Sequence, residues 1–265
     1  MRDPSKRSLL TDLILVILCV LLFGPAQAQY GTLSGDWPSY GGDTGSTKYS
    51  PLDQINAQNF QELEVAWTWT SIDGDLDLEA LQQINEAVRI NNFQGTPLKV
   101  GDKLFIITAL NQVAALDPIN GETLWSFNPE VYLSGSPINY IGYHNRGLAY
   151  WTDGENERIL AGLNDGYLLS LDAATGEPDP AFNGGKIDLA EGLPRATRDV
   201  LDWTGAQPLA VVSPPIVVDD IVVTSSITQA RPINRERPPM WVRGYNIVTG
   251  EHVWDFHTIP EAGEY

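Results

Sequence analysis

Cysteine is nearly absent from this 265-residue chain, which has only Cys19. Cys19 lies in an uncharged apolar run, residues 13–23, that follows a basic start and precedes Ala26-Gln27-Ala28. This order of a basic segment, a short apolar segment and a small-x-small site is typical of a secretory signal peptide. We therefore predict a signal peptide at 1–28, cleaved after Ala28, whose removal leaves a mature chain, 29–265, that has no cysteine and can form no disulfide.

The chain also lacks long hydrophobic runs and has few basic residues. Eleven apolar residues are fewer than the roughly 20 of a membrane-spanning helix, so export to the periplasm is predicted, with an uncleaved anchor as the alternative. Lys and Arg number 16 against 34 Asp and Glu, a formal net charge of −18. So acidic a surface argues against nucleic acid or an anionic membrane as a partner.

Several catalytic signatures are missing from the sequence as well. It has no phosphate-cradling glycine loop and no nucleophile elbow. The three histidines, His144, His252 and His257, show no metal-ligand spacing. The run 73–77 (DGDLD) resembles the start of a calcium loop, but Leu78 stands where an EF-hand needs glycine, so an acidic surface insertion is predicted there. The residues alone therefore identify no metal ligands.

What the sequence has is a fifteen-residue repeat. In each copy an apolar strand ends at Asp or Asn, a turn containing glycine follows, and a second strand is predicted after it. Two copies place a tryptophan near the end, where the middle copy has Pro180. The copies are 113–127 (VAALDPINGETLWSF), 168–182 (LLSLDAATGEPDPAF) and 242–256 (VRGYNIVTGEHVWDF).

Two further short strands are predicted upstream of each copy, which gives four strands per unit. A meander of four short strands repeated at constant phase predicts an all-β fold of propeller blades. The glycines of successive turns, Gly121, Gly176 and Gly250, are 55 and 74 residues apart, more than the ~40 to 50 of compact blades, so long loops are expected. The upstream strands are expected at 98–100, 103–108, 148–152, 158–163, 216–218 and 221–224.

The segment 63–69 (LEVAWTW) resembles the last, tryptophan-bearing strand of another blade, although no three strands precede it. A propeller often closes by letting one terminus complete a blade begun by the other. The partners of this strand are therefore expected beyond the C-terminal end of the chain, so that about three to four blades are predicted here.

Jointly, several motifs resemble the pyrroloquinoline quinone (PQQ) dependent dehydrogenases, close to the glucose and alcohol dehydrogenase branch, from about residue 36 to 265. The resemblance implies an eight-bladed propeller that carries PQQ and Ca²⁺ on its axis and oxidises an alcohol or aldose in the periplasm. It also implies a quinone or a cytochrome c as electron acceptor, and a catalytic aspartate and calcium ligands beyond Tyr265. The motifs are 36–43 (DWPSYGGD), 94–98 (QGTPL), 145–151 (NRGLAYW), the three repeats and 256–265 (FHTIPEAGEY).

Five residues match cofactor-facing positions of that family. Arg146 matches an arginine that pairs with a PQQ carboxylate, a role that suits a bidentate guanidinium. Gln94 matches a cofactor-contacting carboxylate position, while Ser213, Ser225 and Ser226 match hydroxyl positions. The alternatives are a surface arginine paired with an acid, a glutamine that leads into a strand, and serines at strand ends.

Two departures narrow the resemblance. Methanol-oxidising relatives have adjacent cysteines where this chain has Tyr140 and Ile141, which disfavours that branch. Glucose-oxidising membrane relatives have a histidine where this chain has Leu110, which puts glucose in doubt. A second class of function remains open, an exported propeller that binds protein partners in outer-membrane assembly without a quinone.

Overall fold

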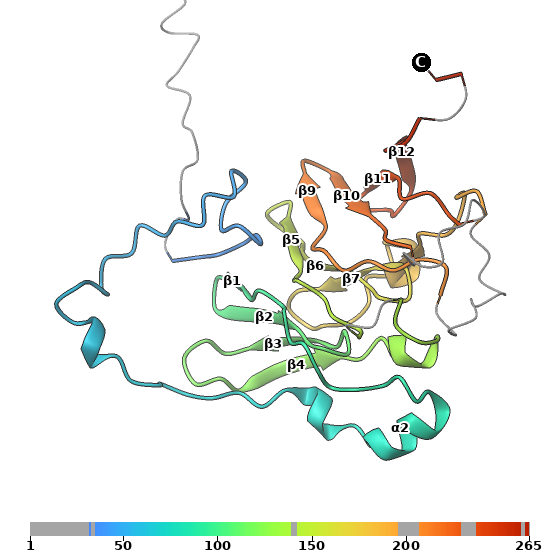
Figure 1. Ribbon diagram of the computed structural model, residues 1–265. Coiled ribbons are helices and arrows are strands. Elements are labelled where there is room, and N and C mark those ends of the chain that lie inside the picture. Colours follow the sequence, from blue (N-terminus) through green and yellow to red (C-terminus); the bar gives the residue numbers. More distant parts are fainter. Residues whose placement is uncertain are drawn as a thin grey trace, which may run out of the picture.

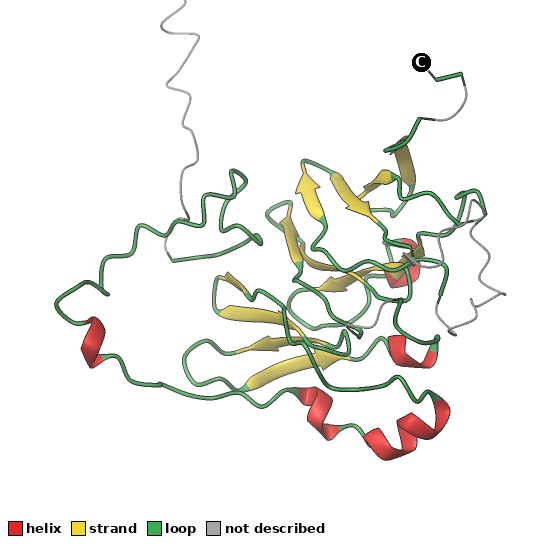
Figure 2. Ribbon diagram, viewed as in Figure 1, coloured by secondary structure: helices red, strands yellow, loops and turns green. Residues whose placement is uncertain are grey.

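The computed structural model describes Thr32 and residues 35–138, 142–195, 207–228, 237–260 and 263–264. The predicted signal peptide and the positions of Tyr140 and Ile141 lie outside these residues. The described chain is all-β apart from short helical turns, and its strands form three four-stranded sheets that follow one another along the chain (Figures 1 and 2). No helix in this part of the chain is long and apolar enough to cross a membrane.

Each sheet is an antiparallel meander, as the repeat predicts. The first has the order β1-β2-β3-β4 and the second β5-β6-β7-β8, and in the third β9 to β12 also follow chain order. The strands are β1 Leu98–Val100, β2 Lys103–Ile107, β3 Val113–Leu116, β4 Thr123–Phe127, β5 Ala149–Thr152, β6 Glu157–Gly162, β7 Tyr167–Asp172, β8 Lys186–Asp188, β9 Ile216–Val218, β10 Ile221–Ser225, β11 Val242–Asn246 and β12 His252–Phe256. The helical turns are η1 Phe60–Glu62, η2 Ile72–Asp75, α2 Leu78–Ile84, η3 Val131–Leu133 and η4 Asn183–Gly185.

The fourth strand of the second sheet differs from the prediction. It does not directly follow the turn at Gly176. Pro178 makes only an isolated bridge to Leu171, and β8 begins at Lys186, after η4. Proline has no N–H to donate to a ladder, so Pro178 and Pro180 delay regular pairing. The extra residues bury Phe182 completely in the core.

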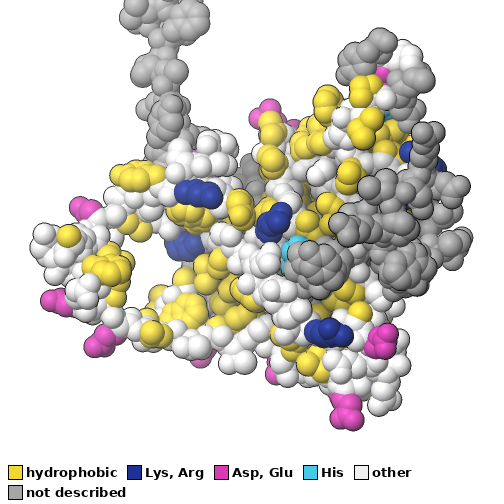
Figure 3. Space-filling view, viewed as in Figure 1, with side chains coloured by type: hydrophobic (Ala, Val, Ile, Leu, Met, Phe, Trp, Pro, Cys, Tyr) yellow, Lys and Arg dark blue, Asp and Glu magenta, His cyan; other side chains and the backbone are white. Residues whose placement is uncertain are grey.

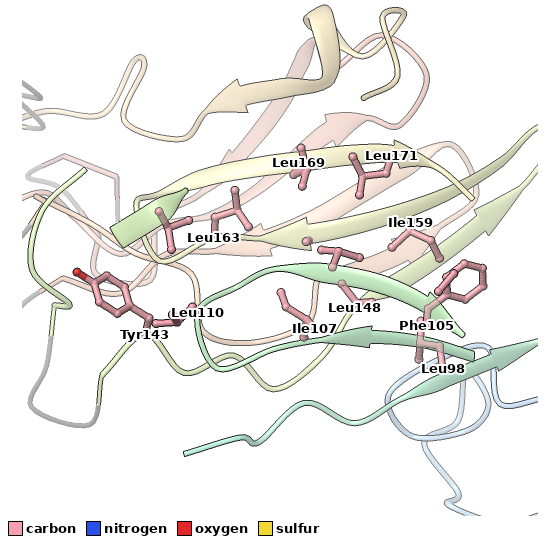
Figure 4. Close-up of a cluster of buried hydrophobic side chains, with 14 of the residues drawn as sticks. Leu98, Phe105, Ile107, Leu110, Tyr143, Leu148, Ile159, Leu163, Leu169 and Leu171 are labelled. Atoms are coloured by element: carbon pink, nitrogen blue, oxygen red, sulfur yellow. The ribbon is translucent and has the colours of Figure 1, made fainter. Parts of the chain in front are cut away.

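The second sheet is buried on both faces, because alternate residues of a strand point to opposite sides. In β6 and β7, Ile159 and Leu169 belong to a core cluster shared with the first sheet. Their neighbours Leu160 and Leu168 belong to a second cluster shared with the third sheet. Figure 4 shows the first cluster between the ribbons of the two sheets. By contrast, every residue of β12 is exposed.

The turn glycines are covered by large side chains from the preceding unit. Gly121 and Gly176 have φ of +77° and +76°, and a Cβ on either would lie 2.5 Å from the indole of Trp67 or Trp125, respectively. The Trp125 indole N–H also donates to the Ala173 carbonyl at 3.2 Å. These positions need glycine for both its backbone freedom and its lack of a side chain. At Gly250 Ile187 takes this place, since the second unit lacks the tryptophan.

Residues 44–71 form an N-terminal arm that leaves the first sheet and returns to it (Figure 1). The predicted strand at 63–69 forms no ladder with any strand that the structure describes, but Trp67 and Trp69 donate indole N–H bonds to Pro118 and Thr123 of the β3–β4 hairpin, at 3.1 and 3.0 Å. Hydrophobic side chains are exposed along the arm, and acidic ones lie at the periphery of the same face (Figure 3). The exposed hydrophobic residues are Tyr49, Leu52, Ile55, Phe60, Leu63 and Val65.

Within the acidic run 73–77, Gly74, Asp75 and Asp77 are exposed, as predicted for a surface insertion, but Asp73 is not. Asp73 is fully buried. Its carboxylate accepts hydrogen bonds from the Thr108 hydroxyl at 2.6 Å, the Gln112 amide at 2.8 Å and the Leu110 backbone N–H at 3.1 Å. A carboxylate that accepts several donors can be buried where an isolated one cannot. The C-terminal end of the arm is thereby fastened to the turn between β2 and β3.

Candidate functional site

The antiparallel meander sorts its connections to two ends of the sheets. The turns around Gly121, Gly176 and Gly250 join the third and fourth strands at one end, which we call the glycine-turn end. The opposite end, called the site end, carries the turns between second and third strands. It also carries three leading segments, 94–97, 145–148 and 213–215, each of which precedes the first strand of its sheet. All five predicted site residues belong to segments at the site end.

The leading segments of the three sheets lie side by side. The Thr96 N–H donates to the Arg146 carbonyl at 2.9 Å, and the Arg146 N–H donates to the Val212 carbonyl at 3.1 Å. Thr96 and Gly147 form a parallel bridge. Gln94, Arg146 and Ser213, which are far apart in sequence, are therefore brought to one place by the backbone.

Arg146 has a fixed backbone and an exposed side chain. Both of its peptide groups are bonded to the neighbouring segments, while its guanidinium NH1 lies 3.5 Å from the Ser213 hydroxyl. No carboxylate among the described residues forms an ion pair with it. The surface ion pair that was the alternative role for Arg146 is therefore not found in the described structure. The exposed side chain of Gln94 adds an amide group at this end.

Gly147 lets the leading segments approach each other. Its φ is +152°, and a Cβ there would meet the Thr96 carbonyl oxygen at 3.3 Å and the Pro214 ring at 3.4 Å. A side chain at this position would push the first and third leading segments away from the second. The glycine after Arg146 thus serves the packing that surrounds the arginine.

Ser225 and Ser226 lie at the end of β10. Ser225 is exposed and pairs in register with Val242, whereas Ser226 is buried. The next residue, Ile227, exchanges two backbone hydrogen bonds with Ala210 at 2.9 and 2.7 Å. The serines are thus next to the chain that reaches Ser213 three residues later, although no contact between them and Arg146 is observed.

The structure also shows buried asparagines that the sequence reasoning missed. Asn111, Asn145 and Asn164 are at most 3% exposed and bond the chain on both sides of Arg146. Asn145 donates to the Gly162 carbonyl at 2.5 Å and accepts from the Gly147 N–H at 3.1 Å. Asn111 and Asn164 each stand in a turn between a second and a third strand, and this shared position is the signal that could have drawn attention to them.

Leu110, which replaces the histidine of the glucose-oxidising relatives, is completely buried in the first core cluster. Nearby Tyr143 is buried too, and its hydroxyl donates to the Gly135 carbonyl at 2.5 Å while accepting from the Asn85 amide at 2.7 Å. Burial raises the pKa of Tyr143 to about 12, against a smaller opposing effect of the bond from Asn85. Tyr143 is therefore neutral at physiological pH.

The described residues hold no cluster of three or more His, Cys, Asp or Glu side chains able to bind a metal ion. Of the histidines, buried His144 lies 3.3 Å from the Gly142 carbonyl. His252 bonds Asp255, and His257 bonds Glu264 and stacks on Trp241. The exposed groups described at the site end are the Arg146 guanidinium, the Gln94 amide and the hydroxyls of Ser213 and Ser225, which are suited to an anionic ligand.

The family model for the beta-propeller domain of glucose, ethanol and alcohol dehydrogenases of the PQQ type matches residues 37–265, and the chain belongs to this family. Quinoprotein glucose dehydrogenase A of Acinetobacter calcoaceticus is 33% identical over 253 residues, or 88% of this chain and 29% of that protein. The glycerol dehydrogenase large subunit of Gluconobacter thailandicus is 30% identical over 90% of this chain and 32% of its own length. The chain thus spans about a third or less of these relatives.

Solved structures show the same fold. The quinohemoprotein alcohol dehydrogenase from Comamonas testosteroni superposes with a TM-score of 0.63 at 24% identity, over 87% of this chain and 28% of that one. A europium-containing methanol dehydrogenase gives 0.60 at 24% identity, over 83% and 31%. The three sheets are therefore blades of a β-propeller, as the repeat predicts.

Proposed function

We propose that this chain supplies part of the cofactor site of a PQQ-dependent dehydrogenase that oxidises an alcohol or aldose in the periplasm. The observation that carries the proposal is the guanidinium of Arg146, exposed at the junction of three leading segments and not ion-paired within the described structure. An arginine fixed by its backbone, whose exposed guanidinium has the Ser213 hydroxyl at 3.5 Å and no carboxylate partner among the described residues, suits recognition of a carboxylate. Membership of the family supports one of the three carboxylates of PQQ as that partner.

The neighbouring groups fit the same ligand. The Ser213 hydroxyl and the Gln94 amide can each donate to an anionic oxygen, and neither adds a negative charge. Ser225 and Ser226 are proposed as further contacts from the third blade. When bound, PQQ supplies the two-electron redox chemistry, and the residues named here bind and orient it. Ca²⁺ is proposed as the accompanying ion, with no ligands assigned in this chain.

The remaining elements of the proposal rest on the family and on the first 28 residues. The relatives include glucose, glycerol and alcohol dehydrogenases, which supports a sugar or alcohol as substrate. A quinone or cytochrome c is proposed as electron acceptor. Periplasmic location is proposed from the predicted signal peptide. Finding Gln29 at the N-terminus of the mature protein by mass spectrometry would support it, whereas an intact Met1 would contradict it.

The experiment is a PQQ titration, followed by tryptophan fluorescence, of the protein at its full encoded length. Arg146→Ala should weaken binding by about 1.5 to 3 kcal/mol, or roughly ten- to 150-fold in Kd, because a charge-assisted bond is lost. Arg146→Lys should restore little, since an ammonium group cannot make the two parallel bonds of a guanidinium.

Lys103→Ala is the matched control, because it removes one positive charge at the glycine-turn end, where Lys103 pairs with Asp102 at 2.9 Å. It should leave the Kd for PQQ unchanged. Equal titration curves for both Arg146 variants and the unmodified protein would remove Arg146 from the site. Failure of the unmodified protein to bind PQQ at all would favour the protein-binding scaffold instead.

A further inference from the structure

Asn164 joins the two segments that carry Arg146 and Ser213. Its side-chain amide donates one hydrogen bond to the His144 carbonyl at 3.0 Å and another to the Val211 carbonyl at 3.1 Å. These carbonyls lie two residues before Arg146 and two residues before Ser213. A single NH₂ group, 3% exposed with its residue, therefore bridges the two segments, beside the direct bond from the Arg146 N–H to the Val212 carbonyl.

The backbone around Asn164 is fixed from both sides. Its N–H donates to the Asn111 side-chain oxygen at 2.8 Å, and the Asn111 amide donates to the Tyr143 carbonyl at 2.6 Å. Leu163, the residue before it, accepts a bond from the Val211 N–H at 2.9 Å. The turn of the second blade thus holds Asn164 in place against the turn of the first blade and the leading segment of the third.

Only an amide meets these demands at this position. Two carbonyl acceptors require two donors on one atom, which the NH₂ of asparagine supplies and a hydroxyl does not. Aspartate would place an anionic oxygen against two carbonyl oxygens, and leucine would leave both carbonyls without a partner in a buried position, at a cost in stability. Loss of the amide should therefore also let the segments move apart.

We propose that Asn164 is a positioning residue that sets the separation of Arg146 and Ser213 and thereby the affinity for the anionic cofactor. This inference rests on the proposed function of Arg146. A purely structural asparagine would lower stability and leave the affinity of the folded protein unchanged. Replacing a positioning residue changes the affinity for PQQ, and this change depends on the presence of Arg146.

The test is a double-mutant cycle on the protein at its full encoded length, read by PQQ titration. Asn164→Leu should weaken PQQ binding by roughly five- to 20-fold in the presence of Arg146. In the Arg146→Ala background the same change should weaken it by less than about twofold, because the group that it positions is gone. Where Asn164→Leu yields no folded protein, Asn164→Ser replaces it in the same cycle.

Asn85→Leu is the matched control. The Asn85 amide also joins two carbonyls, those of Tyr132 and Gly135, at 2.9 and 3.0 Å, and donates to the Tyr143 hydroxyl, but neither carbonyl lies within two residues of a leading segment. It should lower the urea midpoint and leave the Kd for PQQ unchanged. A readout without ligand is amide hydrogen exchange, in which Asn164→Leu should speed exchange in peptides covering 209–213 and Asn85→Leu should not.

The outcomes separate the two proposals. If Arg146→Ala weakens PQQ binding as expected but the folded Asn164 variant has an unchanged Kd, the positioning role alone is overturned. The same holds if the effects of the Asn164 and Arg146 substitutions are purely additive. No effect of Arg146→Ala overturns the proposed function, and this inference with it. Non-additive loss of affinity together with faster exchange at 209–213 supports both.

Discussion

The two ends of the three blades are stabilised in different ways. At the glycine-turn end each blade uses the same local device, in which a carbonyl or carboxylate oxygen of Asp117, Asp172 or Asn246 accepts backbone N–H bonds of the turn that follows, at 2.7 to 2.9 Å. At the site end the connections differ in every blade, and their bonds run between blades. A repeated local device stabilises the scaffold, and the non-repeated end carries the groups suited to binding.

Substitutions at the glycine-turn end should therefore change stability and leave the affinity for PQQ unchanged. The largest effect is expected for Gly176→Val, because φ is +76° and a Cβ would lie 2.5 Å from the Trp125 ring. We expect a loss of about 3 kcal/mol or more in the free energy of unfolding, measured by urea denaturation.

Gly101→Val is its control, since φ is +55° and nothing lies within 4 Å of a Cβ there. Backbone strain alone should cost about 1 to 2 kcal/mol. Equal losses in the two variants would show that the packing of Trp125 on Gly176 contributes nothing. A changed PQQ affinity in folded Gly176→Val would contradict the separation of the two ends.

At the site end, Asp73→Ala should cost about 2 to 4 kcal/mol of unfolding free energy. It leaves Thr108 and Gln112 without their buried acceptor and releases the end of the arm. The exposed neighbour Asp75 is the control, and Asp75→Ala should change stability by less than about 0.5 kcal/mol. If the two alanine variants unfold at the same urea concentration, the buried carboxylate has no stabilising role.

A smaller, pH-dependent effect is expected from Tyr143. The neutral hydroxyl is favoured in the folded state, because the pKa is raised from the ordinary 10 to about 12. Its contribution to stability is therefore complete below pH 10 and is lost as the pH rises from 10 towards 12. The informative quantity is a difference in stability between two proteins that share every other titratable group.

Unfolding of the unmodified protein and of Tyr143→Phe should be measured at pH 9 and pH 11.5. The stability gap between the two proteins should narrow at the higher pH, by an amount on the order of 1 kcal/mol. A gap that is constant with pH would show that the Tyr143 hydroxyl has the same pKa in the folded and unfolded states.

The smallest effect is expected for Ser213→Ala. Its hydroxyl lies 3.5 Å from the Arg146 guanidinium, at the limit of a hydrogen bond, so the free protein should lose almost no stability. The Kd for PQQ should rise about two- to fivefold if the hydroxyl donates to the ligand. An unchanged Kd would show that the Ser213 hydroxyl does not contribute to PQQ binding.

Much of the fold could be predicted from the sequence, because its determinants are local. Alternating apolar residues and Asp/Asn turns with glycine fixed the strands of all three sheets to within one or two residues, apart from β8. That strand was misplaced because proline disrupts pairing in a way that depends on what the following residues can bury. Asp73 was misjudged for a similar reason, since its three donors come from residues 35 to 39 positions away.

For the candidate site, the sequence by itself supplied the residue types and, through the family motifs, the predicted positions Gln94, Arg146, Ser213, Ser225 and Ser226. Only the tertiary structure decided that the segments carrying the first three lie side by side, since backbone bonds between separate blades join them. It also decided that Asn164, a turn residue in the sequence, lies buried between two of those segments. Turn propensity depends on a few neighbouring residues, whereas the partners of a buried amide are set by how whole sheets pack.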